Sequence, residues 1–83
     1  MTPAADIPAA ERREAFFALA ARIFGVDRER LDANTSRDDL AEWDSINHLR
    51  LVMESERLFS TRMPLADIPG ISALGDFIRA LEK

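Results

Sequence analysis

Three segments of this chain carry apolar residues three and four positions apart, and this repeat limits the folds that are open to it. Apolar residues at that spacing lie along one side of an α-helix, whereas a half-buried strand needs apolar and polar residues in alternation. No stretch of the sequence alternates in that way over more than a few residues. The pattern therefore predicts an all-α protein, a small four-helix bundle of three long helices and one short turn.

The first predicted helix begins near Pro8, which suits a first helical turn, and ends at Gly25, which suits a left-handed cap. Its apolar stripe consists of Phe16, Leu19, Ala20, Ile23 and Phe24. The last predicted helix is capped by Ser72. Its stripe consists of Leu74, Phe77, Ile78 and Leu81.

The middle helix is expected to begin at Asp44 or Ser45 and to run to about Phe59. Its predicted apolar face consists of Ile46, Leu49, Val52, Met53 and Phe59, with Leu51 and Leu58 lying off it. Ser55 interrupts that face, and its hydroxyl is expected to bond back to the carbonyl four residues earlier. Between Pro64 and the Pro69-Gly70 pair there is room for one turn, at residues 65–68.

A long connection without helical repeat occupies residues 25–44, between the first two predicted helices. Val26, Leu31 and Leu40 are expected to pin it to the core, and a short helical turn is possible at residues 28–32. Within this connection, residues 27–44 include seven acidic and three basic residues. Loops longer than about 12–15 residues are uncommon in compact domains and often functional. The length of this connection is therefore a feature that the function of the chain has to explain.

The chain has 83 residues, a net charge of −4 and no cysteine. This length predicts one domain at residues 8–83, after a flexible tail at residues 1–7. The missing cysteines exclude disulfides and thiolate chemistry, and the acidic balance argues against nucleic acid as a partner. No apolar run is long enough to span a membrane, and no secretory leader is visible. We therefore expect a cytoplasmic monomer.

Ser45 and His48 form the most enzyme-like arrangement, because positions three apart share one side of a helix. A serine nucleophile needs a base, an orienting carboxylate such as Asp44 or Glu54, and a walled pocket. Nothing in the sequence provides that pocket, so we expect no catalytic residue and interpret His48 as a surface side chain. One histidine and scattered carboxylates predict no metal site either.

Local sequence features indicate that Ser45 starts the helix, and its hydroxyl would also suit a point of attachment. The positive end of a helix dipole favours a phosphate at that position. Trp43 is either core filler or part of a docking surface beside the serine. Local sequence features favour the cap and do not exclude attachment.

The run "DSI", at Asp44, Ser45 and Ile46, resembles the Asp-Ser-Leu signature of acyl carrier proteins. The longer "EWDSINHLRLVMESE" is similar to the Trp-Asp-Ser form of many discrete bacterial carriers. The resemblance covers roughly residues 9–82 and includes "IFGV", the acidic loop and "LGDFIRAL".

This resemblance implies a carrier that is not an enzyme. Ser45, next to Asp44, would receive 4′-phosphopantetheine from a phosphopantetheinyl transferase that uses coenzyme A and magnesium. The arm would hold acyl or aminoacyl groups as thioesters, supplied by an activating enzyme and passed to a synthase or acyltransferase. The family's partner-recognition helix would place a docking surface at Trp43, Ile46, Asn47, Arg50 and Met53.

Some residues depart from the family pattern. Ile46 replaces the commoner leucine, and Ser55 replaces an apolar core residue. Asn47, Arg50 and Arg57 stand where carriers of fatty acid biosynthesis often have acidic residues. The resemblance thus favours a specialised carrier, in a lipid, polyketide or other secondary pathway. An aminoacyl or peptidyl carrier is an alternative, and so is an unmodified helical adaptor that binds through Ile46 and Met53.

Overall fold

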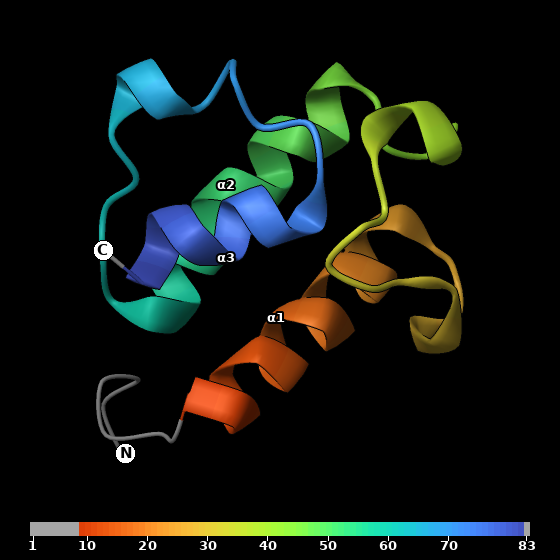
Figure 1. Cartoon of the computed structure of the whole chain (residues 1–83), viewed down its shortest axis with the longest axis horizontal. Helices are drawn as coiled ribbons and strands as arrows, with labels where there is room; N and C mark the ends of the chain where they lie inside the picture. The colour runs from red at the N-terminus through yellow and green to blue at the C-terminus, as the bar shows by residue number, and fades with distance from the viewer. Residues whose placement is uncertain (1–8, 83) are drawn as a thin grey trace.

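The computed structural model describes residues 9–82 and contains three α-helices in that range (Figure 1). These are α1 (Ala9–Phe24), α2 (Ser45–Phe59) and α3 (Leu74–Glu82). Figure 1 shows α1 and α2 running in opposite directions, which the long connection between them permits. The all-α prediction is confirmed. The predicted tail and Pro8 lie outside the described residues.

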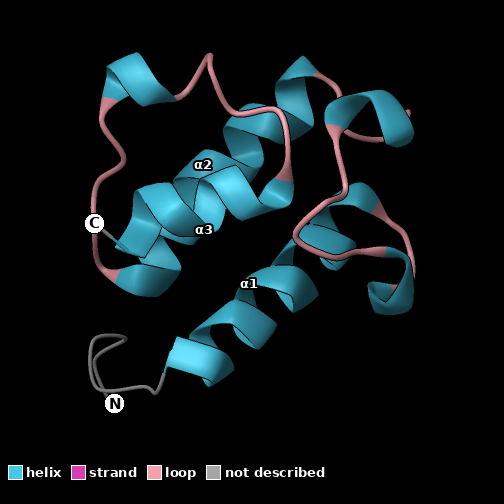
Figure 2. Ribbon diagram, in the orientation of Figure 1, coloured by secondary structure: helices cyan, strands magenta, loops and turns pink. Residues whose placement is uncertain are grey.

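Short 3-10 turns connect the helices (Figure 2). Arg28–Arg30 and Leu65–Asp67 fall where the sequence predicts turns, and Arg37–Asp39 is one that no apolar repeat indicates. The four-helix count is not confirmed, because the element between α2 and α3 is a turn of three residues. Residues 9–82 contain no β-strand and one isolated antiparallel bridge, between Ser36 and Ala73.

Aromatic rings fill the centre of the core. Phe16 and Phe77 are fully buried, and their ring centroids lie 5.7 Å apart. The Trp43 ring lies 6.1 Å from Phe77 and 5.6 Å from Phe24. The predicted stripe of α1 is confirmed, since four of its residues are buried and Ile23 packs half-buried against the core. Burying one such large side chain stabilises the fold by about 1.5–3 kcal/mol, so these rings dominate the energetics.

The predicted face of α2 is wrong. The residues of α2 that the core buries are His48, Leu51, Val52 and Ser55. Of the predicted face, only Val52 is buried and Phe59 is half-buried, while Ile46, Leu49 and Met53 lie in solvent. The spacing of apolar residues did not reveal the buried face of α2, because two residues of that face, His48 and Ser55, are polar.

Ser55 is tolerated in the core because its hydroxyl is satisfied within the helix. It donates to the carbonyl oxygen of Leu51, four residues earlier as expected, and lies 3.2 Å from that of Val52. A buried hydroxyl without such a partner would cost about 1–3 kcal/mol.

The long connection is tied to the beginning of α3 by backbone hydrogen bonds. They run from Arg37 to Ser72 (3.0 Å), from Leu74 to Thr35 (3.0 Å) and from Gly75 to Ala33 (2.9 Å), each from N–H to carbonyl oxygen. A Cβ at Gly75 would meet the Ala33 oxygen at 2.9 Å, so this close approach requires glycine. Leu31 and Leu40 are buried, which confirms them as pins of the loop.

The end of α1 and the beginning of α3 both have definite caps. Gly25 ends α1 at φ +71°, as predicted, and its N–H bonds to Ala21 at 2.8 Å. At α3 the acceptor is Asp76, whose carboxylate takes the N–H groups of Ser72 and Ala73, both at 3.1 Å. The prediction that Ser72 caps α3 is wrong. The Asp76 carboxylate is the acceptor at this helix end, and the Ser72 hydroxyl is itself a donor to that carboxylate. These hydrogen bonds, Ser72 first, lower the pKa of the Asp76 carboxyl.

Candidate functional site

Asp44, not Ser45, caps the N-terminus of α2. Its side chain accepts the N–H of Asn47 at 2.8 Å, and its carbonyl oxygen accepts the N–H of His48 at 2.8 Å. Ser45 is the first helical residue. The prediction that Ser45 itself caps the helix is therefore corrected, because within residues 9–82 the cap is made by Asp44.

Ser45 is exposed, and its hydroxyl makes no hydrogen bond to any described residue. The N–H groups of Ser45 and Ile46 precede the first intrahelical bond, since the N–H groups of a first turn have no helical partner. They add to the positive end of the α2 dipole, which favours an anion. The hydroxyl is thus both accessible and placed in a field that suits a phosphate.

Trp43 belongs to the core and not to a docking surface, so that part of the predicted site is wrong. Its side chain is 3% exposed and stacks with Phe24. Its indole Nε1–H donates to Nδ1 of His48 at 3.0 Å. A buried tryptophan needs such an acceptor, and the loop end before Ser45 is held in place by this contact.

His48 is also buried, at 5% exposed, which overturns the prediction of a surface side chain. Because Nδ1 accepts the Trp43 bond, the ring is neutral with its proton on Nε2, and Nε2–H donates to the carbonyl oxygen of Ile68 at 3.2 Å. Burial lowers the pKa of His48, the Ile68 bond opposes this, and the charge of Arg37 lowers it further. With both nitrogens engaged, His48 is not available as a base for Ser45.

The outer side of α2 presents an apolar stripe to solvent. Its residues are Ile46, 69% exposed, Leu49, 55% exposed, and Met53, 63% exposed. Arg50 is exposed on the same helix. Three large apolar side chains within eight residues of one helix form a surface that a solvated helix does not need. We call Ile46, Leu49 and Met53 the outer stripe.

The sequence-predicted docking residues thus divide into two groups. Ile46, Arg50 and Met53 are exposed, as a docking surface requires, although Ile46 and Met53 were also assigned to the predicted apolar face. Asn47 is half-buried and its side-chain amide donates to the carbonyl oxygen of Glu42 at 2.8 Å, so it holds the loop end. Leu49 was assigned to the core and belongs to the outer stripe. Its position three after Ile46 and four before Met53 was the available signal.

The charges along α2 beyond the outer stripe are mixed. Arg57 lies 3.8 Å from Glu54, and both are surface side chains. An ion pair between such side chains contributes little to stability.

Among residues 9–82 no group of three or more histidine or acidic side chains lies close enough to hold a metal ion. None of the described helices is long and apolar enough to cross a membrane.

A scan against models of known protein families finds no match, and a search of curated proteins finds none either. Any function assigned to the chain therefore rests on the geometry at the start of α2 and on the residues quoted from its sequence.

Proposed function

We propose that the chain is a carrier protein, not an enzyme, which bears 4′-phosphopantetheine on Ser45. The observation that carries this proposal is an exposed serine hydroxyl at the first position of α2, left free because Asp44 caps the helix. A modifying enzyme can reach such a hydroxyl without unfolding the domain. The resemblance of "DSI" to the carrier signature supports the same residue.

The residues present fit a phosphodiester at this position. The N–H groups of Ser45 and Ile46 and the α2 dipole favour its negative charge. The Asp44 carboxylate opposes it, although one of its oxygens accepts the Asn47 N–H and exposure to water weakens the repulsion. The bound arm would supply a thiol, which the chain itself lacks because it has no cysteine.

The outer stripe is the docking surface of this proposal. Ile46 directly follows the modified residue, so a partner that covers Ile46, Leu49 and Met53 would bring its active site to the arm. Arg50 beside the stripe favours partners with acidic groups at the contact. The partner classes are the phosphopantetheinyl transferase, an acyl- or aminoacyl-activating enzyme, and a synthase or acyltransferase.

The cargo is proposed to be an acyl group of a specialised lipid, polyketide or other secondary pathway. The basic residues on α2 support this, because Arg50 and Arg57 stand where fatty acid carriers often have acidic residues. The three helices and the Leu65–Asp67 turn would then be the four helical elements of a carrier domain. An aminoacyl or peptidyl cargo is the alternative, and loading by purified activating enzymes would distinguish the two.

The direct test is incubation of the purified chain with coenzyme A, magnesium and a broad-specificity transferase, followed by intact mass measurement. We expect a gain of one phosphopantetheine in the wild-type chain and none in Ser45→Ala. Ser72→Ala is the matched control, because Ser72 is also exposed and lies just before a helix. No gain in the wild type, or an equal gain in Ser45→Ala, would refute the proposal.

The outer stripe also supports a second candidate, an unmodified adaptor that binds a partner through this surface alone. The two functions separate in cells. A carrier loses function in Ser45→Ala and in Leu49→Ser, whereas an adaptor loses it only in Leu49→Ser.

A further inference from the structure

Met53 is the residue of the outer stripe whose side chain can be changed chemically after the chain has folded. It is 63% exposed, whereas Met63, a short distance along the chain, is 3% exposed. We propose that a peroxide oxidises Met53 to its sulfoxide and that this oxidation weakens docking on the outer stripe. The effect on docking rests on the function proposed above, whereas the oxidation itself does not require modification of Ser45.

Methionine carries all the sulfur of this chain, which has three methionines and no cysteine. A peroxide transfers one oxygen atom to the thioether: an S–O bond forms, the O–O bond breaks, and the second oxygen leaves as water. The sulfur is oxidised by two electrons and the peroxide is reduced by two. Methionine sulfoxide reductases reverse the change, so it can act as a switch.

Met63 is protected from this reaction by the fold. It belongs to the hydrophobic core, and its backbone N–H donates to the Glu56 carboxylate at 2.5 Å. A peroxide reaches its sulfur only when the chain opens, and a polar oxygen there would disrupt the packing. Met53 contributes little burial, so its oxidation should leave the stability of the fold unchanged. The two methionines therefore predict selective oxidation without unfolding.

The sulfoxide would change the character of the outer stripe. Ile46, Leu49 and Met53 form this surface, so oxidation replaces one of its three apolar contacts by a polar group. Arg50 and Arg57 are exposed at three positions before and four after Met53, on the same side of the helix. Their guanidinium groups and water can both donate to the sulfoxide oxygen. A partner that covers the stripe would have to remove these donors or leave the oxygen unpaired, which disfavours docking.

The first test treats the unmodified full-length chain with hydrogen peroxide and follows each methionine by peptide mass mapping. We expect the sulfoxide to form at Met53 at least about tenfold faster than at Met63, because exposure governs the rate. The urea midpoint of the chain oxidised at Met53 should equal that of the untreated chain. Equal rates at the two residues, or a lowered midpoint, would overturn the proposal.

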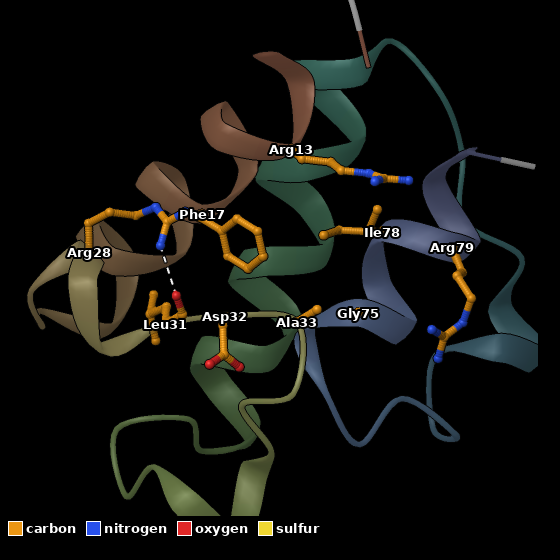
Figure 3. A pocket seen from close by; sticks show the side chains of 9 residues that line it. All are labelled: Arg13, Phe17, Arg28, Leu31, Asp32, Ala33, Gly75, Ile78 and Arg79. Carbon is orange, nitrogen blue, oxygen red and sulfur yellow. Dashed lines mark hydrogen bonds between the residues drawn. The ribbon is translucent and has the colours of Figure 1, made fainter. Parts of the chain in front are cut away.

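Two further measurements locate the change on the molecule. Retention on a hydrophobic-interaction column should fall on oxidation, and unchanged retention would mean that the stripe keeps its apolar character. Amide chemical shifts should change along α2. The pocket between α1, residues 28–33 and α3, drawn in Figure 3, is lined by described residues that include neither methionine nor any residue of α2. Shifts at Phe17, Gly75 and Ile78 should therefore stay constant, and changes there as large as those in α2 would show that oxidation acts through the fold.

Docking is measured by the rate of phosphopantetheine transfer at low chain concentration, after the peroxide has been removed. We expect this rate to fall about five- to thirtyfold in the chain oxidised at Met53, as for a residue that contributes strongly to an interface. Reduction by methionine sulfoxide reductases should restore it. Met53→Leu keeps an apolar side chain of similar size without sulfur, so peroxide should not change the rate relative to that of the untreated variant.

The outcomes separate this proposal from that of a carrier. An unchanged rate in the oxidised wild-type chain, or an equal loss in treated Met53→Leu, would refute an effect of Met53 on docking. If the untreated chain gained no phosphopantetheine, the carrier proposal would fail, whereas the selectivity and the column retention would still decide whether oxidation of Met53 alters the outer stripe.

Discussion

The buried pair of Trp43 and His48 predicts how the stability of this protein depends on pH. Nδ1 of His48 accepts the Trp43 Nε1–H at 3.0 Å, and Nε2–H donates to Ile68 at 3.2 Å. A proton can enter only at Nδ1, where it would face the Trp43 N–H and break that hydrogen bond. Protonation therefore disrupts the contact that joins the loop end before α2 to His48 of α2 itself.

The sign of the effect follows from the lowered pKa of His48. The unfolded chain binds this proton near the ordinary value of 6.5, and the folded chain binds it only at lower pH. Stability is therefore complete above the ordinary pKa and is lost as the pH falls toward the folded value. One proton changes the free energy of unfolding by at most about 1.4 kcal/mol per pH unit. The total loss is limited by the cost of leaving the indole N–H buried without a partner, about 1–3 kcal/mol.

Urea unfolding between about pH 5 and 7 measures this effect, because His48 is the only histidine and its ordinary pKa falls in that range. The fluorescence of Trp43, the only tryptophan, reports the transition. Glu14 and Asp76 have pKa values lowered from 4.5 and 3.8, so their losses fall at lower pH.

His48→Gln is the matched control, since an amide can accept from Trp43 and donate to Ile68 without titrating. We expect wild-type stability to fall with the pH and His48→Gln to stay flat. A flat wild-type profile, or the same slope in His48→Gln, would refute the reasoning.

Substitutions at three further positions test the fold by the same urea unfolding assay. Gly75→Ala places a Cβ 2.9 Å from the Ala33 oxygen and should cost about 1–3 kcal/mol, and an unchanged midpoint would mean that the loop yields freely. Asp44→Ala removes the α2 cap and should cost about 1 kcal/mol, whereas Asp44→Asn keeps an acceptor and should cost less; equal losses would exclude the cap as the cause. Ser55→Leu should destabilise by about 1–3 kcal/mol, since the site is fully buried and a larger side chain must displace its neighbours, and a gain in stability would disprove that.

The sequence predicted α1 and α3 well because local physics determines them. Their stripes contain only apolar residues, and Gly25 is an unambiguous stop, found at φ +71°. The caps of α2 and α3 were predicted less accurately. Asp44 and Asp76 accept the backbone N–H groups, and residue spacing alone does not show which of several neighbouring polar side chains will do so. Ser45 was placed correctly at the start of α2, but the predicted role of helix cap belongs to Asp44, one position earlier.

The buried side of α2 could not be predicted from an apolar count. His48 is satisfied by Trp43 and by Ile68, which lies twenty residues further along the chain. Ser55 is satisfied by its own helix. Only the folded contacts make these two polar residues inexpensive to bury, and once they occupy the core side, the apolar residues opposite them must face solvent.

The outer stripe is the part of this structure that folding alone does not explain. Ile46, Leu49 and Met53 are each more than half exposed, so each forgoes most of the roughly 1.5–3 kcal/mol that burial of such a side chain contributes. Replacing Leu49 by serine should therefore leave the free energy of unfolding almost unchanged. The outer stripe is not needed by the fold and begins beside the exposed Ser45, which agrees with the docking surface that we propose. Under that proposal, a mass gain at Ser45 would indicate a carrier, and its absence together with loss of function in Leu49→Ser would indicate an unmodified adaptor.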